Sequence, residues 1–237
     1  MQDAYSLRCV AQMMGGTKRA IQEAYISVTE ELNSCSDNPV IYPTGDGDGV
    51  ALMGGNFDRA YLCIHMDALC IAMTHLGKLV ERRTDRLTNR HFSDYPPFLV
   101  KNPGLNSGFM ITQYTSAGLV AEMKVLSHPV SVDSIPTSAN QEDHVSMGTI
   151  ASRKAATIIS HVQMVLAIEL LCAAQAADFK DSAKLGKGSK AAYDMVRSEV
   201  TFMDKDRAIY LDMNKVAAMI RSGKIVDAVE QAVGELK

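Results

Sequence analysis

Two side chains near the start of the sequence, Tyr5 and Arg8, could act on one small molecule because they are three residues apart. A guanidinium group such as that of Arg8 binds a carboxylate through two parallel hydrogen bonds. If residues 5–8 form one helical turn, Tyr5 and Arg8 face the same side. The alternative for an arginine near a helix start is a surface ion pair, and for the tyrosine a packed ring whose hydroxyl has a partner.

Further candidates lie in segments rich in Pro, Gly, Asn and Ser. Asn38 precedes Pro39, Phe57 follows two glycines and an asparagine, and Glu142 stands within Gln-Glu-Asp-His. Taken alone, Asn38 is an ordinary turn residue and Phe57 an ordinary packing residue. Glu142 could also belong to an acidic first helical turn that Asn140 caps, since the helix dipole favours acids there.

Long helices must position these residues, because apolar side chains recur every three or four residues over long stretches. The sequence predicts an all-α fold: a bundle of long helices in residues 1–179, with functional loops between them, and a small helical cap in 180–237. The glycine-rich stretch 45–49 is expected to be a hairpin tip. The helices are expected at about 7–33, 57–87, 107–127, 145–179, 191–200, 214–222 and 225–236.

Composition excludes several classes of function. The chain has 24 Lys and Arg against 27 Asp and Glu, which argues against a general binder of nucleic acid. No uninterrupted apolar run is as long as a membrane span, so we expect a protein of the cytoplasm. The sequence has no phosphate-binding glycine loop and no histidine pair spaced for zinc, and the five cysteines form no CxxC pair.

Six motifs, in order over nearly 180 residues, together resemble the aromatic amino-acid ammonia-lyases, and among them the histidine ammonia-lyases. The Gln-Glu-Asp-His of the last motif favours the histidine branch, although tyrosine-directed relatives can keep its first three residues. The motifs are QDAYSLR at 2–8, SDNP at 36–39, GGNF at 54–57, ERR at 81–83, GLNSGFM at 104–110 and VDSIPTSANQEDHVSM at 132–147.

The resemblance implies a homotetramer of long helices, whose active sites are built by loops from three subunits. It also implies elimination of ammonia at a methylidene-imidazolone electrophile, which forms from an Ala-Ser-Gly tripeptide. The 237 residues do not contain this tripeptide; the nearest string, Ser116-Ala117-Gly118, has another order. We therefore expect a carboxyl-terminal portion that is inactive alone, has no cofactor of its own and receives the electrophile from an amino-terminal part.

The resemblance also assigns roles to five of the candidate residues. Arg8 would bind the substrate carboxylate, and Tyr5 would approach the electrophile and take part in proton transfer. Gln2 would make a polar contact with the electrophile. Asn38 would hydrogen-bond the substrate or the region of the electrophile, and Phe57 would lie against either of them.

Glu142 would decide selectivity, in a catalytic and substrate-binding role. An imidazole ring offers an N–H donor that a carboxylate can accept, whereas a phenyl ring offers none, and a site built on such a bond rejects an analogue that lacks it. His144 belongs to the same motif, and both interpretations, in contact with the site or not, stay open. No metal ligand is expected.

The first hypothesis is thus the carboxyl-terminal part of an enzyme that converts L-histidine to urocanate. Two alternatives stay open: a lyase or aminomutase for tyrosine or phenylalanine, and a non-catalytic helical assembly protein derived from this family. The expected partners are the amino-acid substrate and either an amino-terminal half or sister subunits in a tetramer-like homo- or hetero-oligomer. No nucleic-acid or membrane partner is expected.

Overall fold

The computed structural model describes residues 2–45 and 47–236, and this part of the chain is all-α apart from one small hairpin. The expected fold class is therefore confirmed. Every predicted helix is present, although a separate turn, α1, precedes the first long helix, and α6 and α7 begin four and five residues earlier than expected. The helices are α1 (Tyr5–Arg8), α2 (Val10–Leu32), α3 (Ala60–Thr88), α4 (Met110–Leu126), α5 (Gly148–Asp178), α6 (Lys187–Glu199), α7 (Ile209–Arg221) and α8 (Lys224–Val233).

The chain forms two compact units. Unit 1 takes in the described residues of Met1–Val10, His75–Met123 and Ile159–Lys237, and unit 2 comprises Ala11–Thr74 and Lys124–Ile158. The long helices α3 and α5 each contribute one part to unit 1 and another to unit 2. Because unit 1 combines bundle helices with the C-terminal helices, the division expected at residue 179 stays a prediction.

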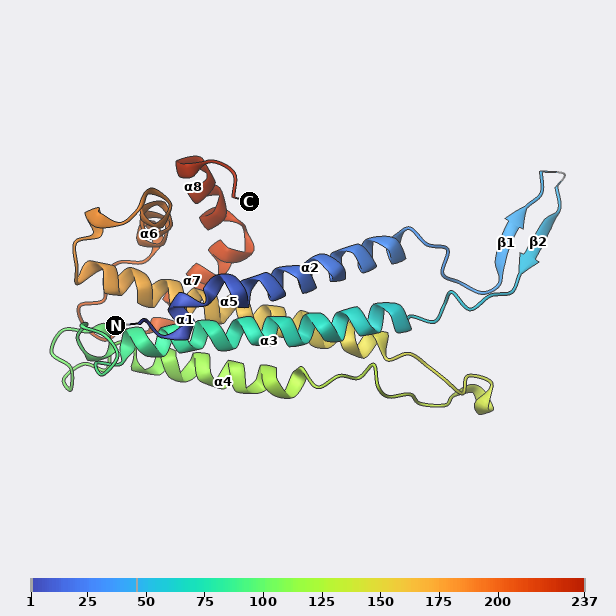
Figure 1. Ribbon diagram of the computed structural model, residues 1–237, viewed down its shortest axis with the longest axis horizontal. Helices are drawn as coiled ribbons and strands as arrows, with labels where there is room; N and C mark the ends of the chain where they lie inside the picture. The colour runs from blue at the N-terminus through green and yellow to red at the C-terminus, as the bar shows by residue number, and fades with distance from the viewer. Residues whose placement is uncertain (1, 46, 237) are drawn as a thin grey trace. The chain divides into compact units, whose positions relative to one another are not determined.

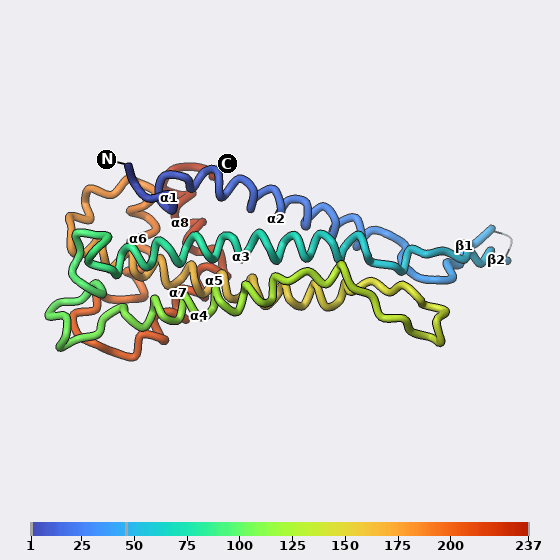
Figure 2. Tube along the Cα trace, turned by 60° about the horizontal axis from the view of Figure 1, so that its bottom comes forward, coloured from blue at the N-terminus to red at the C-terminus, as the bar shows by residue number. Residues whose placement is uncertain are grey.

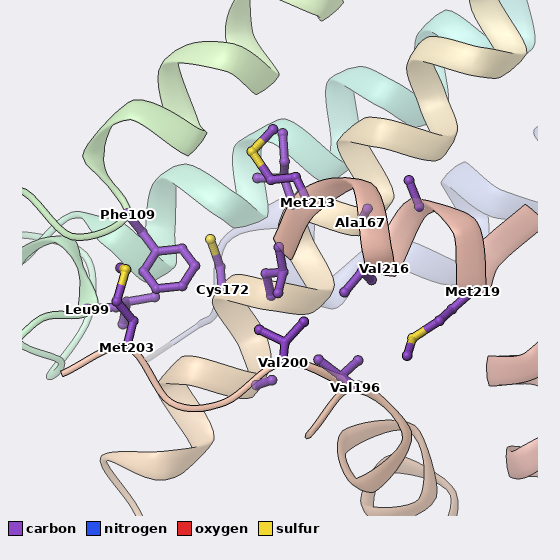
Figure 3. Packing of buried hydrophobic residues seen from close by; sticks show 14 of the residues in the cluster. Leu99, Phe109, Ala167, Cys172, Val196, Val200, Met203, Met213, Val216 and Met219 are labelled. Carbon is purple, nitrogen blue, oxygen red and sulfur yellow. The ribbon is translucent and has the colours of Figure 1, made fainter. Parts of the chain in front are cut away.

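Unit 1 has an extensive hydrophobic core. Within it, α4 lies alongside the parts of α3 and α5 that belong to this unit (Figure 1, Figure 2). Figure 3 shows Phe109, Leu99 and Met203 around Cys172 of α5, with residues of the C-terminal helices beside them. Helices α6, α7 and α8 also pack against one another. Burial of this apolar surface is the main stabilising term of the unit.

Polar contacts fix the register of the helices in unit 1. Arg83 of α3 forms a bidentate ion pair with Glu169 of α5. The fully buried amide of Gln175 donates to the carbonyl oxygens of Leu99 and Met203, at 3.0 and 2.9 Å. One side chain of α5 thus holds two loops, since its nitrogen satisfies backbone groups that burial would otherwise leave unpaired.

Unit 2 contains most of α2, the start of α3, the start of α5 and the hairpin. Strands β1 (Val40–Pro43) and β2 (Gly49–Leu52) pair antiparallel. The Thr44 N–H donates to the carbonyl of Asp48 at 3.2 Å across the turn. The pairing confirms the expected hairpin around residues 45–49; Asp46 of its tip lies outside the described residues.

The five cysteines are all free thiols. Burial raises the pKa of Cys70 to about 11 and that of Cys172 to about 12. Both thiols are therefore protonated at neutral pH, and they act as small apolar core residues rather than as nucleophiles.

By length and composition, α3 and α5 are each apolar enough to cross a membrane, although 44% of the relevant window of each is buried inside the structure. The apolar core helix of a soluble protein has the same properties. This feature is weak evidence for a membrane span.

Candidate active site

Two of the predicted site residues, Phe57 and Glu142, line the same cavity in unit 2. The cavity has a volume of about 410 Å³. One wall is formed by Gly55, Phe57 and Asp58 just before α3, and the other by residues 141–146 just before α5. The fold therefore brings together two loops that are more than 80 residues apart in the sequence.

Asn38 positions the wall that carries Phe57. The Gly54 N–H donates to the side-chain oxygen of Asn38 at 3.1 Å, which closes the base of the hairpin. The peptide bond between Asn38 and Pro39 is cis. On the other side of Phe57, the carboxylate of Asp58 accepts from the Ala60 N–H at 2.8 Å and caps the first turn of α3. Phe57 itself is 51% exposed, so its ring is accessible to a ligand.

A closed pair of backbone hydrogen bonds between Thr137 and Glu142 shapes the opposite wall. Each residue donates its N–H to the carbonyl of the other, at 2.9 and 3.3 Å. The intervening Ser138, Ala139 and Asn140 all have positive φ, between 50° and 69°. Such a run of left-handed residues is strained, and strain of this kind concentrates at functional sites.

The side chain of Glu142 is held as a carboxylate. The Thr137 hydroxyl donates to one of its oxygens at 2.5 Å. The hydrogen bonds from Thr137 and then Ser138 hold the pKa of Glu142 below its usual value, because they favour the charged form. Glu142 is exposed and reaches the cavity as a hydrogen-bond acceptor at neutral pH.

His144 also lines the cavity, together with Asp58. Their nearest nitrogen and oxygen atoms, Nδ1 and Oδ2, are 3.9 Å apart, and the His144 side chain is largely exposed. With Glu142 and Asp143, Asp58 makes the cavity rich in carboxylates. Such a cavity favours ligand groups that donate hydrogen bonds or carry positive charge.

One expectation about this loop is wrong. Helix α5 begins at Gly148, so Glu142 and Asp143 do not lie in its first turn. Asn140 lies in the short 3-10 turn Ser138–Asn140 and does not cap α5. The strained turn, rather than the end of a helix, decides where the Glu142 carboxylate lies.

The loop that carries Glu142 is anchored at its beginning by a buried carboxylate, Asp67 of α3. Asp67 is only 2% exposed and accepts from the N–H groups of Val130 and Ser131, both at 2.7 Å. Its other oxygen is 2.9 Å from the Lys154 ammonium of α5, which also donates to the His128 carbonyl. Burial raises the pKa of Asp67, but the hydrogen bonds from Lys154, Ser131 and Val130 together outweigh burial and lower it.

The other predicted site residues, Gln2, Tyr5 and Arg8, belong to unit 1, whereas the cavity is lined by unit 2 alone. Tyr5 is the first residue of α1 and Arg8 the last, and they face the same side, as expected. The Arg8 guanidinium carbon lies 4.5 Å from the centre of the Tyr5 ring. The Arg8 Nε donates to the Asp3 carbonyl at 2.9 Å. Arg8 makes no ion pair within the described part of the chain, and Gln2, Tyr5 and Arg8 are all exposed.

Residues 116–118, the string closest to an electrophile precursor, lie inside α4. Their order is Ser-Ala-Gly, and Ser116 is fully buried in a helix rather than exposed in a loop. These residues do not fit the role of precursor. Among residues 2–45 and 47–236 there is also no group of three or more His, Cys, Asp and Glu side chains that could hold a metal ion.

Sequence reasoning missed the residues that hold the site loops. Thr137 stands within the motif at 132–147, but only the folded turn shows that its hydroxyl binds Glu142. Asp67 and Lys154 lie inside long helices and are separated by 87 residues. A charged residue on an otherwise apolar helix face was the available signal for Asp67.

A family model described as aromatic amino acid lyase matches residues 1–198. The chain is 52% identical over its whole length to histidine ammonia-lyase 2 of Fusobacterium nucleatum and 49% identical to the histidine ammonia-lyase of Alkaliphilus metalliredigens. It covers 46% of each of these relatives, so it spans about half of their length.

Solved structures have the same fold over nearly the whole chain. The crystal structure of histidine ammonia-lyase from Trypanosoma cruzi superposes with a TM-score of 0.92 at 43% identity, covering 99% of this chain and 46% of that one. Tyrosine aminomutase from Streptomyces globisporus also gives a TM-score of 0.92, at 36% identity, covering 99% of this chain and 44% of the aminomutase.

Proposed function

The chain belongs to the aromatic amino acid lyase family, and from this premise we propose that it is the carboxyl-terminal part of a histidine ammonia-lyase. The reaction would be elimination of ammonia from L-histidine to give urocanate. The resemblance stated from the sequence motifs is confirmed by the family model and by relatives near 50% identity. The activity and its site residues are the proposal.

The observation that carries the proposal is the Glu142 carboxylate in the cavity beside Phe57. An imidazole ring is flat and apolar on its faces and has an N–H at its edge. Phe57 can contact the face of such a ring while Glu142 accepts the hydrogen bond from its edge. The hydrogen bonds that lower the pKa of Glu142 support this role, because they favour and orient its charged, accepting form.

Arg8 and Tyr5 would act on the amino-acid end of the substrate. The Arg8 guanidinium can bind the α-carboxylate through two hydrogen bonds, and its lack of an ion pair within the described residues leaves it available. The Tyr5 hydroxyl lies on an exposed ring and can hold or move a proton near the reacting carbon. Gln2 would add a polar contact there.

The methylidene-imidazolone group, when present, supplies an electrophile that makes the amine a better leaving group. This chain offers no tripeptide to form it, so we propose that another segment brings it. On this chain, Tyr5, Gln2 and Asn38 are the polar side chains that would face the group. They fit it in chemical type, since Tyr5 and Gln2 are exposed and Asn38 is partly exposed.

The proposal implies an oligomer. Tyr5 and Arg8 belong to a unit other than the one that holds Phe57 and Glu142, and several large apolar side chains of α2 and the hairpin are exposed. Exposed apolar surface of this extent is usually covered by a partner. We propose that sister subunits or an amino-terminal half cover it, in a tetramer-like assembly in the cytoplasm.

The first test is to purify the native complex through this chain, measure its mass, and assay it for urocanate formation from L-histidine. Turnover by a complex that contains a second polypeptide, or a longer form of this one, supports the proposal. A complex that releases ammonia only from tyrosine or phenylalanine would replace the proposal with the alternative of a lyase for those amino acids. No turnover of any of the three amino acids would favour the non-catalytic assembly protein.

A Glu142→Gln variant then tests the assignment of the ring site. We expect kcat/KM for L-histidine to fall by about 100-fold or more, because the imidazole N–H loses a charged acceptor. The matched control is Glu235→Gln, which removes the same charge from the exposed C-terminal tail. Unchanged histidine turnover in Glu142→Gln would refute the role of this residue.

A further inference from the structure

Arg59, two residues after Phe57, contacts three separate segments of unit 2. Its guanidinium lies 2.5 Å from Glu31 at the end of α2 and donates to the Ser36 hydroxyl at 3.0 Å. Its backbone N–H donates to the Ser146 hydroxyl at 3.1 Å. Both the side chain and the backbone of this residue are therefore used in contacts between loops.

Two of the segments that Arg59 contacts, those of Ser36 and Ser146, each carry a residue of the candidate site. Ser36 is two residues before Asn38, and Ser146 is four residues after Glu142. Phe57 lies on the same short segment as Arg59. The segments of Asn38, Phe57 and Glu142 are thus all joined through Arg59.

Close packing against the start of α5 fixes the backbone of Arg59. A Cβ atom added to Gly148 would lie 3.3 Å from the Cβ of Arg59 and 3.4 Å from its carbonyl oxygen. This spacing is tighter than ordinary van der Waals contact, so glycine is the residue that allows the approach. The Ser146 end of the loop is therefore held directly against Arg59.

A second contact supports the same junction. The Tyr61 hydroxyl donates to the Glu30 carboxylate at 2.6 Å, so neighbouring acids at the end of α2 bind neighbouring residues around the start of α3. Without Arg59, Tyr61 still joins α2 to α3, but the bond to the Ser36 hydroxyl is lost, and the Asn56 amide reaches the neighbouring Cys35 carbonyl at 3.5 Å only. Loss of the Arg59 side chain should therefore loosen the site loops and leave the helices unchanged.

The ion pair alone does not explain the arrangement as a stabilising device. The Arg59 side chain is 40% exposed, and ion pairs at such exposure contribute little to the free energy of unfolding. A guanidinium group does, however, offer several donors in a fixed plane, which suits it to hold two acceptors at a set angle.

We propose that Arg59 is a positioning residue that sets the distance between the Asn38 loop, Phe57 and the Glu142 loop, and thereby the fit of the substrate ring. The inference rests on the proposed function for its substrate, but not for its structural consequence. No contact of Arg59 itself with substrate is implied.

The test compares hydrogen–deuterium exchange of the full chain with that of Arg59→Gln and of a charge-matched control, Arg19→Gln. Arg19 forms an exposed i,i+4 pair with Glu23 on α2, remote in sequence from the loops. In Arg59→Gln we expect roughly tenfold faster exchange in 33–38 and 134–146, and unchanged exchange within α3. The control should match the wild-type chain everywhere.

Two outcomes would overturn the inference: unchanged exchange in both loops, or exchange that rises equally in the loops and in α3, which would indicate a general stabilising role.

In the active complex, Arg59→Gln should raise KM for L-histidine about tenfold while kcat changes less than threefold, since binding geometry rather than chemistry is altered. An equal loss in kcat and in kcat/KM would contradict it. If the wild-type complex does not turn over histidine, the proposed function fails while the exchange experiment still decides the role of Arg59.

Discussion

The two regions that carry the proposed site residues are held in different ways. The loop that carries Glu142 is fastened at its start by Asp67, at its turn by Thr137 and at its end through Ser146. Helix α1, which carries Tyr5 and Arg8, is four residues long and has no buried residue. Its side-chain contacts are local ones, between Arg8, Tyr5 and Asp3.

From this difference we propose that binding of the ring and the chemistry at the amino-acid end depend on different regions of the chain. The proposed ring pocket has its geometry set within one compact unit of one chain, because hydrogen bonds of Asp67, Thr137 and Asn38 hold its loops. The α1 turn, which we propose to act on the amino-acid end of the substrate, has no buried residue, as expected of a surface that other segments complete. Substrate selectivity should therefore depend on this chain, and turnover on the assembly.

The largest expected effect is on the anchored region. Asp67→Ala should lower the free energy of unfolding by about 3 to 5 kcal/mol, because it leaves the Lys154 ammonium and two N–H groups without their partner in a buried place. Urea unfolding of the full chain measures this. The control, Asp85→Ala, removes a more exposed carboxylate from the same helix and should cost under about 1 kcal/mol. Equal losses in the two variants would mean that the loop is not anchored as described.

The α1 region should respond in the opposite way. Arg8→Ala should leave the free energy of unfolding within about 0.5 kcal/mol of the wild-type value, because nothing in α1 is buried. In the active complex it should lower kcat/KM for L-histidine by about 100-fold, since the carboxylate loses a bidentate partner. Turnover that survives this change would refute the carboxylate role, and a large loss of stability would remove the contrast between the two regions.

Acid should weaken the anchor. The folded-state pKa of Asp67 is below its ordinary value, so its contribution to stability is present above the unfolded-state pKa and is lost as pH falls through the folded-state pKa. We expect the free energy of unfolding of the wild-type chain to decline more steeply below about pH 4 than that of Asp67→Asn, which has no carboxyl group to protonate there. Parallel pH profiles for the two proteins would contradict this.

The smallest expected effect is on the pKa of Glu142, in the strained turn of the anchored loop. Thr137→Val removes the hydroxyl that binds Glu142 but keeps the backbone pair, so the pKa of Glu142 should rise towards its usual value without loss of fold. An NMR titration of the Glu142 carboxyl measures the change, with the Glu235 carboxyl as internal reference. An unchanged titration would show that Thr137 does not hold the carboxylate.

Much of the fold followed from local pattern. The helices were predicted because their apolar periodicity runs over several turns, and the hairpin because its turn is rich in glycine. The alternative in which Asn140 caps a helix is wrong for a local reason. A Ser-Ala-Asn turn with three positive φ angles has no simple sequence signal, and the acidic pair after it resembled a helix start.

The site residues divide in the same way. Tyr5 and Arg8 could be placed on one face from their spacing alone, because a single helical turn decides it. That Phe57 and Glu142 share a cavity could not be derived from spacing, since they are 85 positions apart (142 − 57) and two long helices must first fold. Asp67 and Lys154 stayed unnoticed because a charged residue in a helix is ordinarily a solvated one. Arg59, just before α3, stayed unnoticed because its contacts are with segments distant in the sequence.

The sequence by itself determined the helical class of this protein, the face that Tyr5 shares with Arg8, and its family, because all three depend on local pattern and on motifs read in order. Only the tertiary structure decided which carboxylates are buried and paired, how the strained turn places Glu142, and which loops meet at Arg59. These features depend on contacts between segments distant in the sequence, and packing of the long helices brings those segments together.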